Sequence, residues 1–245
     1  MCGRYASSRR PEDLAGMFHA EREPEQDLPP SWNVAPTDQV WGVVERVGKG
    51  PDADSPVRRL RPLRWGLVPS WAKDPSVGSR MINARMETAH EKPAYRNAFA
   101  RHRCLLPADG YYEWTAVPDP LTGKTAKQPY FIAPADGSVM AMAGLFEYWR
   151  DRSVADDDSP GAWLTTCTVI TTEAADASGR IHPRMPLTLP PDAYDAWLDP
   201  RQHDTDRLRA LLRLPADGDV EVRAVSTAVN SVRNNGPQLL DPPDE

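Results

Sequence analysis

The hydrophobic positions of the chain form short runs separated by proline, glycine and aspartate, which is typical of short strands. An exception is the stretch 11–20, where Leu14, Met17 and Phe18 recur at helical spacing behind Pro11, so we predict an amphipathic helix there. Further helices are predicted at residues 94–102, 191–198 and 204–212, and strands at residues 40–47, 63–68, 103–107, 129–133, 139–146, 163–171 and 220–225.

These elements do not alternate regularly between strand and helix, which disfavours a doubly wound parallel sheet. We therefore predict an α+β fold, a mainly antiparallel sheet or barrel-like core with peripheral helices. Loops are expected at residues 48–55, 117–128 and 151–161. Residues 1–236 are predicted to form a single domain, followed by a short proline-rich and acidic tail, 237–245, that frays.

Composition narrows the class of protein. A signal-like apolar run at the N-terminus and a stretch of about 18 apolar residues are both missing from the sequence, so we expect an intracellular protein that does not span a membrane. The three cysteines form neither an even disulfide set nor a CxxC pair, and the histidines lack metal-ligand spacing. We expect no metal and no cofactor.

The charge is unevenly distributed. The net charge is −6, yet residues 1–105 hold 17 Lys and Arg against 13 Asp and Glu, whereas residues 106–245 hold 12 against 22. Arginines cluster between residues 58 and 103. This excess predicts either a local anion-binding face or an ordinary solvated surface, and charge alone does not separate the two.

Cys2 directly follows the initiator methionine, so removal of Met1 would leave an N-terminal cysteine. Such a residue carries an amine and a thiol on adjacent carbons, with reference pKa values of about 7.7 to 8.0 and about 8.5. The pair captures aldehydes, because the amine condenses to an imine and the thiol then adds to the imine carbon, closing a thiazolidine ring. A cysteine that merely follows the start codon is the alternative.

Three other polar residues stand beside apolar runs. Asn83 could orient an amine, or could be a turn asparagine bonded to backbone. Glu113 lies among aromatic residues, and apolar surroundings disfavour a charged carboxylate, which would suit it to proton transfer near neutral pH; it could equally be a surface residue on a turn. His182 lies in a proline-stiffened segment, where it could shuttle protons, although most histidines are surface residues.

Two tryptophans, Trp65 and Trp71, follow the arginine-rich stretch. Aromatic side chains can stack unpaired bases, with about 1 to 3 kcal/mol per base. They are also common core residues, and we expect at least one of the two to lie in the core.

Together these segments resemble the SRAP family, the SOS response-associated peptidases. Six segments carry the resemblance in order, and with a further segment at residues 232–237 the resemblance covers nearly the whole chain. They are Cys2-Gly3-Arg4-Tyr5, Trp32-Asn33-Val34-Ala35-Pro36-Thr37, Arg64 to Trp71, Asn83-Ala84-Arg85-Met86-Glu87-Thr88, Gly110 to Trp114, and Ile181 to Pro186.

The resemblance implies a sensor of abasic sites in single-stranded DNA that crosslinks to the lesion through Cys2 and so shields it. It implies that Met1 is removed autocatalytically, that Asn83 positions the amine and that Glu113 and His182 move protons. A β-elimination that cleaves the strand at the abasic site is an expected side activity. The DNA-binding residues that it implies are Arg4, Asn33, Pro36, Trp65, Trp71, Arg85, Trp114 and, as a weaker candidate, Thr171.

One departure from the family pattern concerns Pro183, which stands where an acidic residue is common and could slow proton transfer at His182. Two other classes stay open: a self-processing cysteine peptidase that cleaves other proteins, and a non-catalytic single-strand binder. We expect a monomeric cytoplasmic protein that joins the nucleoid when it is bound to damaged DNA, with abasic single-stranded DNA as its partner.

Overall fold

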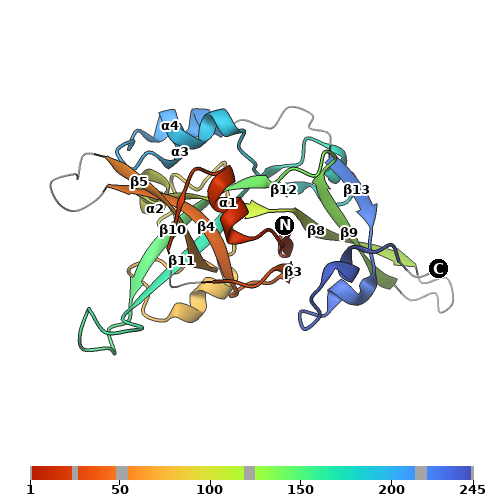
Figure 1. Ribbon diagram of the computed structural model, residues 1–245, viewed down its shortest axis with the longest axis horizontal. Coiled ribbons are helices and arrows are strands. Elements are labelled where there is room, and N and C mark those ends of the chain that lie inside the picture. Colours follow the sequence, from red (N-terminus) through yellow and green to blue (C-terminus); the bar gives the residue numbers. More distant parts are fainter. Residues whose placement is uncertain (1, 24–26, 48–54, 119–124, 213–219, 244–245) are drawn as a thin grey trace.

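The computed structural model describes residues 2–23, 27–47, 55–118, 125–212 and 220–243, and a closed ring of five strands forms its centre (Figure 1). The ring runs in the order β11-β10-β7-β4-β5, with antiparallel neighbours, and a parallel pairing of β5 with β11 at Arg64 and Thr166 closes it. Its members are β4 (Gln39–Val47), β5 (Pro56–Trp65), β7 (Arg103–Ala108), β10 (Met140–Arg150) and β11 (Trp163–Glu173).

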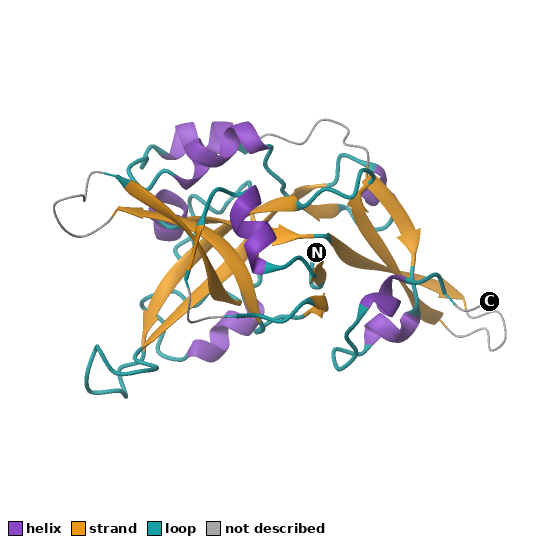
Figure 2. Ribbon diagram, in the orientation of Figure 1, coloured by secondary structure: helices purple, strands orange, loops and turns teal. Residues whose placement is uncertain are grey.

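Three short strands extend this barrel. They are β2 (Glu21–Arg22), which pairs with β5, and β6 (Asn83–Arg85) and β12 (Arg184–Pro186), which both pair with β11. A second, antiparallel sheet lies beside the barrel in the order β13-β9-β8-β1-β3 (Figure 2). Its strands are β1 (Tyr5–Ser7), β3 (Ser31–Val34), β8 (Gly110–Pro118), β9 (Thr125–Pro134) and β13 (Val220–Ala224).

The helices are short and lie at the periphery (Figure 2). The α-helices are α1 (Pro11–Met17), α2 (Arg96–Arg101), α3 (Tyr194–Leu198) and α4 (Thr205–Leu211). The 3-10 turns are η1 (Pro75–Arg80), η2 (Ala177–Arg180), η3 (Pro191–Ala193), η4 (Thr227–Asn230) and η5 (Pro237–Leu240). This arrangement confirms the predicted α+β class with a barrel-like core and peripheral helices.

The alternation of side chains along the barrel strands separates two layers of core. Leu105 of β7 packs in the layer that contains the helix residues Phe99 and Trp197, whereas its neighbour Leu106 packs in a layer with Trp65 and Cys2. The second layer therefore fills the face of the barrel strands opposite the helices, and the N-terminus of the chain belongs to it. A third, smaller cluster joins β8 and β9 to the C-terminal turns.

Most predicted elements are present, with three differences. The strand predicted at 63–68 ends at Trp65, because Gly66 takes a positive φ of 123° and turns the chain. Within the predicted loop 117–128, residues 117–118 and 125–128 belong to β8 and β9. The tail was predicted to fray from residue 237, but Pro237–Leu240 forms η5, whose Leu239 is 1% exposed. The predicted loop at 48–55 lies outside the described residues except for Ser55.

Within the described ranges, no helix has the length and apolar character needed to cross a membrane. Among the same residues, no group of three or more His, Cys, Asp or Glu side chains is arranged to hold a metal ion.

Candidate functional site

Cys2 lies immediately before β1, with its side chain 0% exposed among the barrel core residues. Its Sγ lies 3.9 Å from the carbonyl oxygen of Arg4. Burial raises the pKa of the Cys2 thiol, and the negative charge of the nearby Glu113 raises it further. The thiol is therefore protonated at neutral pH, and it needs a proton acceptor before it can act as a nucleophile.

Asn83 holds the backbone of Cys2. It begins β6, whose parallel pairing with β11 sets Asn83 opposite Val169, and its Nδ2 donates to the carbonyl oxygen of Cys2 at 2.7 Å. From the other side, the Tyr95 hydroxyl donates to the Asn83 carbonyl oxygen at 3.2 Å. Burial raises the pKa of Tyr95 to about 12, so this donor keeps its proton at neutral pH. Asn83 thus contacts the Cys2 backbone at its carbonyl oxygen, and its role in positioning the amine stays a prediction.

Glu113 comes from the second sheet. It lies on β8 opposite Tyr130 of β9, and its side chain is 5% exposed. Strand β8 also pairs with β1, just beyond Cys2, so the two antiparallel pairings bring the carboxylate toward the cysteine. The effect of its charge on the pKa of Cys2 reflects this proximity. The sequence had indicated Glu113 as a candidate for proton transfer, and the structure buries it close enough to Cys2 for its charge to act on the thiol.

His182 belongs to the segment between η2 and β12. It follows η2, and its backbone N–H donates to the Ser178 carbonyl oxygen at 3.0 Å. The buried Ser178 side chain faces Tyr111. Burial raises the pKa of the Tyr111 hydroxyl, and the nearby Cys2 and Glu113 raise it further. The His182 ring is fixed locally, since its Nδ1 accepts from the Arg184 N–H at 3.0 Å.

Two residues of this site were not singled out from the sequence. Arg184 forms a bidentate pair with Glu87, with N to O distances of 2.6 and 3.1 Å, and its Nη2 donates to the Thr171 carbonyl oxygen at 2.6 Å. It therefore fastens the His182 segment to β11 and to the turn after β6. Tyr111, buried between Cys2 and Ser178, is the other. Both residues lay inside quoted motifs, Arg184 in Ile181 to Pro186 and Tyr111 in Gly110 to Trp114, but the sequence did not indicate a role for either.

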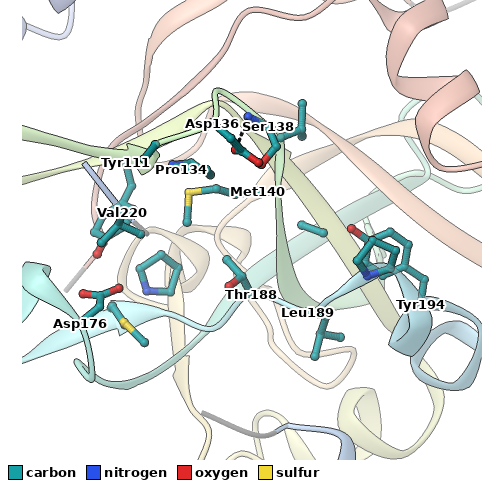
Figure 3. Close-up of a pocket in the computed structure, with 16 residues that line it drawn as sticks. Tyr111, Pro134, Asp136, Ser138, Met140, Asp176, Thr188, Leu189, Tyr194 and Val220 are labelled. Atoms are coloured by element: carbon teal, nitrogen blue, oxygen red, sulfur yellow. Dashed lines mark hydrogen bonds between the residues drawn. The ribbon is translucent and has the colours of Figure 1, made fainter. Parts of the chain in front are cut away.

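A cavity of about 750 Å³ lies beyond Tyr111 (Figure 3). Methionine, leucine and proline side chains line it, with Asp136 and Asp176 as its charged residues. Tyr111 belongs to its wall, but Cys2, Asn83 and Glu113 do not line it. The cavity is thus a neighbour of the cysteine site and separate from it.

Arg4, Asn33 and Trp114 form one group. Arg4 Nη1 donates to Asn33 Oδ1, and the Arg4 guanidinium lies over the Trp114 ring at 5.9 Å from its centroid. Trp114 Nε1 in turn donates to Asn230 Oδ1 at 2.6 Å. Partial burial lowers the pKa of Arg4. The three predicted DNA-binding residues therefore lie together, with Arg4 only two residues along the chain from Cys2, and Arg4 and Trp114 bind the last residues of η4.

Besides Asn33, which is 4% exposed, two more of the predicted DNA-binding residues are buried. Trp65 is 0% exposed, packs edge-on against Tyr5 at 5.2 Å and donates from Nε1 to the Ile82 carbonyl oxygen. Thr171 is fully buried beneath Arg184. The predictions that Trp65 stacks a base and that Thr171 contacts a phosphate are therefore corrected. Both side chains pack in the core, because neither reaches the surface. The expectation that at least one of the two tryptophans lies in the core is confirmed.

Trp71, Arg85 and Pro36 remain available. Trp71 is 64% exposed, and Arg85 is exposed at the end of β6. Pro36 is half-buried in the turn after β3, where Thr37 has a positive φ of 78° and donates its N–H to the Trp65 carbonyl oxygen. Their roles in binding DNA stay predictions.

The arginine-rich stretch is divided between the fold's interior and its surface. Arg58 pairs with Glu45 and Asp195, and the buried Arg103 donates to four backbone carbonyl groups around α2 and α3. Arg80 and Arg85 are exposed. Part of the positive charge counted in the sequence therefore holds the fold together, and an anion-binding face stays a prediction for the exposed arginines.

Comparisons with known proteins agree with this geometry. Residues 1–232 match the protein family described as "SOS response associated peptidase (SRAP)". The chain is 40% identical over 243 residues to the "Abasic site processing protein YoaM" of Bacillus subtilis (strain 168), with 98% of each chain covered. It is 34% identical over 275 residues to the "Abasic site processing protein HMCES" of Gallus gallus, covering 99% of this chain and 78% of that one.

Solved structures share the fold. A protein from Bacteroides thetaiotaomicron superposes with a TM-score of 0.76 at 20% identity, covering 98% of this chain and 99% of that one. A second, from Bordetella bronchiseptica, gives a TM-score of 0.69 at 26% identity, with coverages of 92% and 100%.

Proposed function

Because the chain belongs to the SOS response associated peptidase (SRAP) family, we propose that it processes abasic sites in single-stranded DNA by forming a covalent crosslink through Cys2. The relatives that carry the name "abasic site processing protein" support the substrate class. The observation that carries the mechanism is the hydrogen bond from Asn83 Nδ2 to the Cys2 carbonyl oxygen, in a site where Glu113 is the adjacent carboxylate.

The site first has to expose an amine. Water adds across the peptide bond between Met1 and Cys2, which releases methionine and leaves Cys2 with a free amino group. We assign the proton transfer in this hydrolysis to Glu113; its charge raises the pKa of the Cys2 thiol, which supports the assignment. The self-cleavage accounts for a peptidase activity without a second protein substrate.

The crosslink then forms in two steps. The abasic deoxyribose opens to an aldehyde, the Cys2 amine adds to its carbon, and loss of one water molecule gives an imine. The thiol sulfur adds to the imine carbon while its proton passes to the nitrogen, so the thiazolidine ring closes with no net change in protons. Since burial keeps the Cys2 thiol protonated, Glu113 or His182 has to accept and return that proton.

A lyase side reaction follows from the same intermediate. The imine acidifies the adjacent carbon of the sugar, and loss of a proton there with departure of the 3′ phosphate cleaves the strand. Ring closure by the thiol removes the imine, so a competent Cys2 thiol suppresses cleavage.

Trp71 and Arg85 are exposed and suited to hold the strand by stacking and by phosphate contact.

The test uses the purified chain with single-stranded DNA that carries one abasic site, analysed by intact mass spectrometry and by a denaturing gel. We expect loss of Met1 and a heat-stable adduct whose mass equals protein plus DNA minus one water. Cys2→Ala should bind the same DNA and form no thiazolidine. Undamaged DNA of the same sequence is the matched substrate control.

Other outcomes separate the alternatives. If wild-type protein and Cys2→Ala bind DNA equally and neither forms an adduct, the chain is a non-catalytic single-strand binder. If the chain cleaves peptides in trans and ignores the lesion, it is a general cysteine peptidase. Either result would sink the crosslinking proposal.

A further inference from the structure

The segment between η4 and η5, residues 231–235, is exposed along its whole length. Exposed loops usually have few fixed contacts. This loop, which we call the C-terminal loop, is instead held by side chains from strands that lie far from it in the sequence. In Figure 1 the turns η4 and η5, in blue, lie beside the end of β3 and below the N-terminus.

Asn33 is the main anchor. Its side chain, 4% exposed, donates from Nδ2 to the carbonyl oxygens of Ser231 and Asn234, both at 2.9 Å, and of Val229 at 3.3 Å. Its Oδ1 accepts from Arg4, which also donates to the Val229 carbonyl oxygen at 3.0 Å. The Asn33 amide is therefore fully engaged with protein, which leaves it no group to offer to DNA.

Further bonds hold the two ends of the loop. Trp114 Nε1 donates to the side chain of Asn230, as described above. The Trp32 N–H donates to Asn235 Oδ1 at 2.8 Å, and Asn235 Nδ2 donates to the Pro30 carbonyl oxygen at 3.2 Å. The loop is thus a rigid part of the surface.

Two side chains project from this fixed backbone. Val232 is 59% exposed, which places an apolar group in water. Arg233 is exposed, and among the described residues it has no carboxylate within the 4.0 Å range of an ion pair. A single strand of nucleic acid presents a phosphate and a base in every nucleotide. Arg233 and Val232 together suit such a strand, since one is a cation without an acidic partner and the other an exposed apolar side chain.

We propose that the C-terminal loop is part of the DNA-binding surface, with Arg233 contacting a phosphate and Val232 packing against a sugar or base of the strand. Asn33 is then a positioning residue that sets this loop, and it does not contact DNA. The inference rests on the proposed function for the identity of the partner. It follows from continuity, because Arg4 and Trp114, which lie near the Cys2 site, bond to Val229 and Asn230 directly before the loop.

The experiment measures the affinity of the full chain for undamaged oligodeoxythymidylate across a series of salt concentrations. For Arg233→Ala we expect an affinity about three- to tenfold lower at low salt, and a slope of log affinity against log salt that is smaller by about 0.7, the value for one phosphate on a single strand. Arg152→Ala is the matched control, since Arg152 is also exposed and lies in the loop between β10 and β11 at the far end of the molecule (Figure 1). It should leave both quantities unchanged.

The role of Asn33 is tested by a double-mutant cycle. If Asn33 acts by setting the loop, Asn33→Ala lowers DNA affinity in the wild-type background and adds little once Arg233 is already alanine. Additive losses would show instead that Asn33 contacts DNA by itself. The exposed variants Arg233→Ala and Val232→Ser do not disturb buried bonds, so they test the loop even if Asn33→Ala fails to fold.

A parallel assay with abasic DNA keeps the two proposals apart. If the wild-type protein crosslinks abasic DNA and Arg233→Ala shows the same salt slope as the wild type, the loop proposal is overturned. The crosslinking function then stands. A wild-type protein that binds DNA without crosslinking overturns the function alone, and the loop is then judged by the affinities. A wild-type protein without affinity for DNA overturns both.

Discussion

The hydrogen bond from Asn83 to the Cys2 carbonyl oxygen fixes the backbone from which the reactive amine would project. Because a donor is needed at that point, Asn83 is not interchangeable with its isostere aspartate, whose oxygens would face the carbonyl oxygen instead. The Tyr95 hydroxyl, which donates to the Asn83 backbone, would stay in place in such a variant. The effect of the exchange would therefore be confined to the contact with Cys2.

For Asn83→Asp we expect the rate of crosslinking to fall by about 10²-fold, because a loss of alignment at the reacting group has a cost of that order. The measurement is a single-turnover time course with abasic single-stranded DNA at saturating concentration, after mass spectrometry has shown that Met1 is absent. Affinity for undamaged DNA should be unchanged. A variant that crosslinks at the wild-type rate would show that Asn83 does not position the amine.

The turn after β5 separates the buried Trp65 from the exposed Trp71. Gly66 has a φ of 123°, and its backbone packs against that of Gly78 so closely that an added Cβ would lie 2.5 Å from the Gly78 carbonyl oxygen. This turn ends β5 with Trp65 inside the barrel. Residues 67–69 are buried after it, and the chain reaches the surface at Ser70 and Trp71. A side chain at residue 66 would have to displace the segment that contains Gly78.

Gly66→Ala should therefore lower the free energy of unfolding by about 2 to 4 kcal/mol, combining a positive φ with a clash against backbone. Gly137→Ala is the matched control, because Gly137 also has a positive φ, 70°, but an added Cβ there meets nothing within 4 Å. We expect it to lose only about 1 kcal/mol. Urea unfolding of both variants measures the difference, and equal losses would contradict the close approach.

Three buried thiols link the stability of the entire chain to alkaline pH. Burial raises the pKa values of Cys2, Cys104 and Cys167 in the folded state. An unfolded cysteine loses its proton near about pH 8.5, whereas the folded thiols keep theirs, so the folded chain binds more protons above that pH. The stabilisation is complete below about pH 8.5 and declines as the pH rises further.

We expect the free energy of unfolding, measured in urea with reductant present, to fall between pH 8.5 and 9.5 by up to about 1.4 kcal/mol per pH unit for each thiol. Cys104→Ala should be less stable at every pH but should show a shallower decline, because one titrating group is missing. The comparison uses slopes, so the cavity left by the substitution does not affect it. Identical slopes would show that Cys104 titrates normally in the folded chain.

The sequence predicted the parts of the fold that depend on local patterns. The helix at Pro11 and the strands β4, β10 and β11 follow from spacing within a few residues. The family resemblance implied that Asn83 positions the Cys2 amine; the structure shows Asn83 bonded to the Cys2 carbonyl oxygen, and the role at the amine stays a prediction. The surroundings of three predicted DNA-binding residues depend on partners far along the chain, which local patterns cannot show. Trp65 is buried inside the barrel, and Thr171 lies beneath Arg184. Asn33 is bonded to the C-terminal loop.

The closure of the barrel has a consequence for folding. The pairing of Arg64 with Thr166 joins strands that are separated by most of the barrel sequence, so a large loop must be ordered before this contact forms. Cys2 is synthesised well before Cys167 and Met185, which belong to the core around it. During synthesis Cys2 therefore stays outside its finished surroundings, and the environment that buries its thiol arises only after those later residues have joined the barrel.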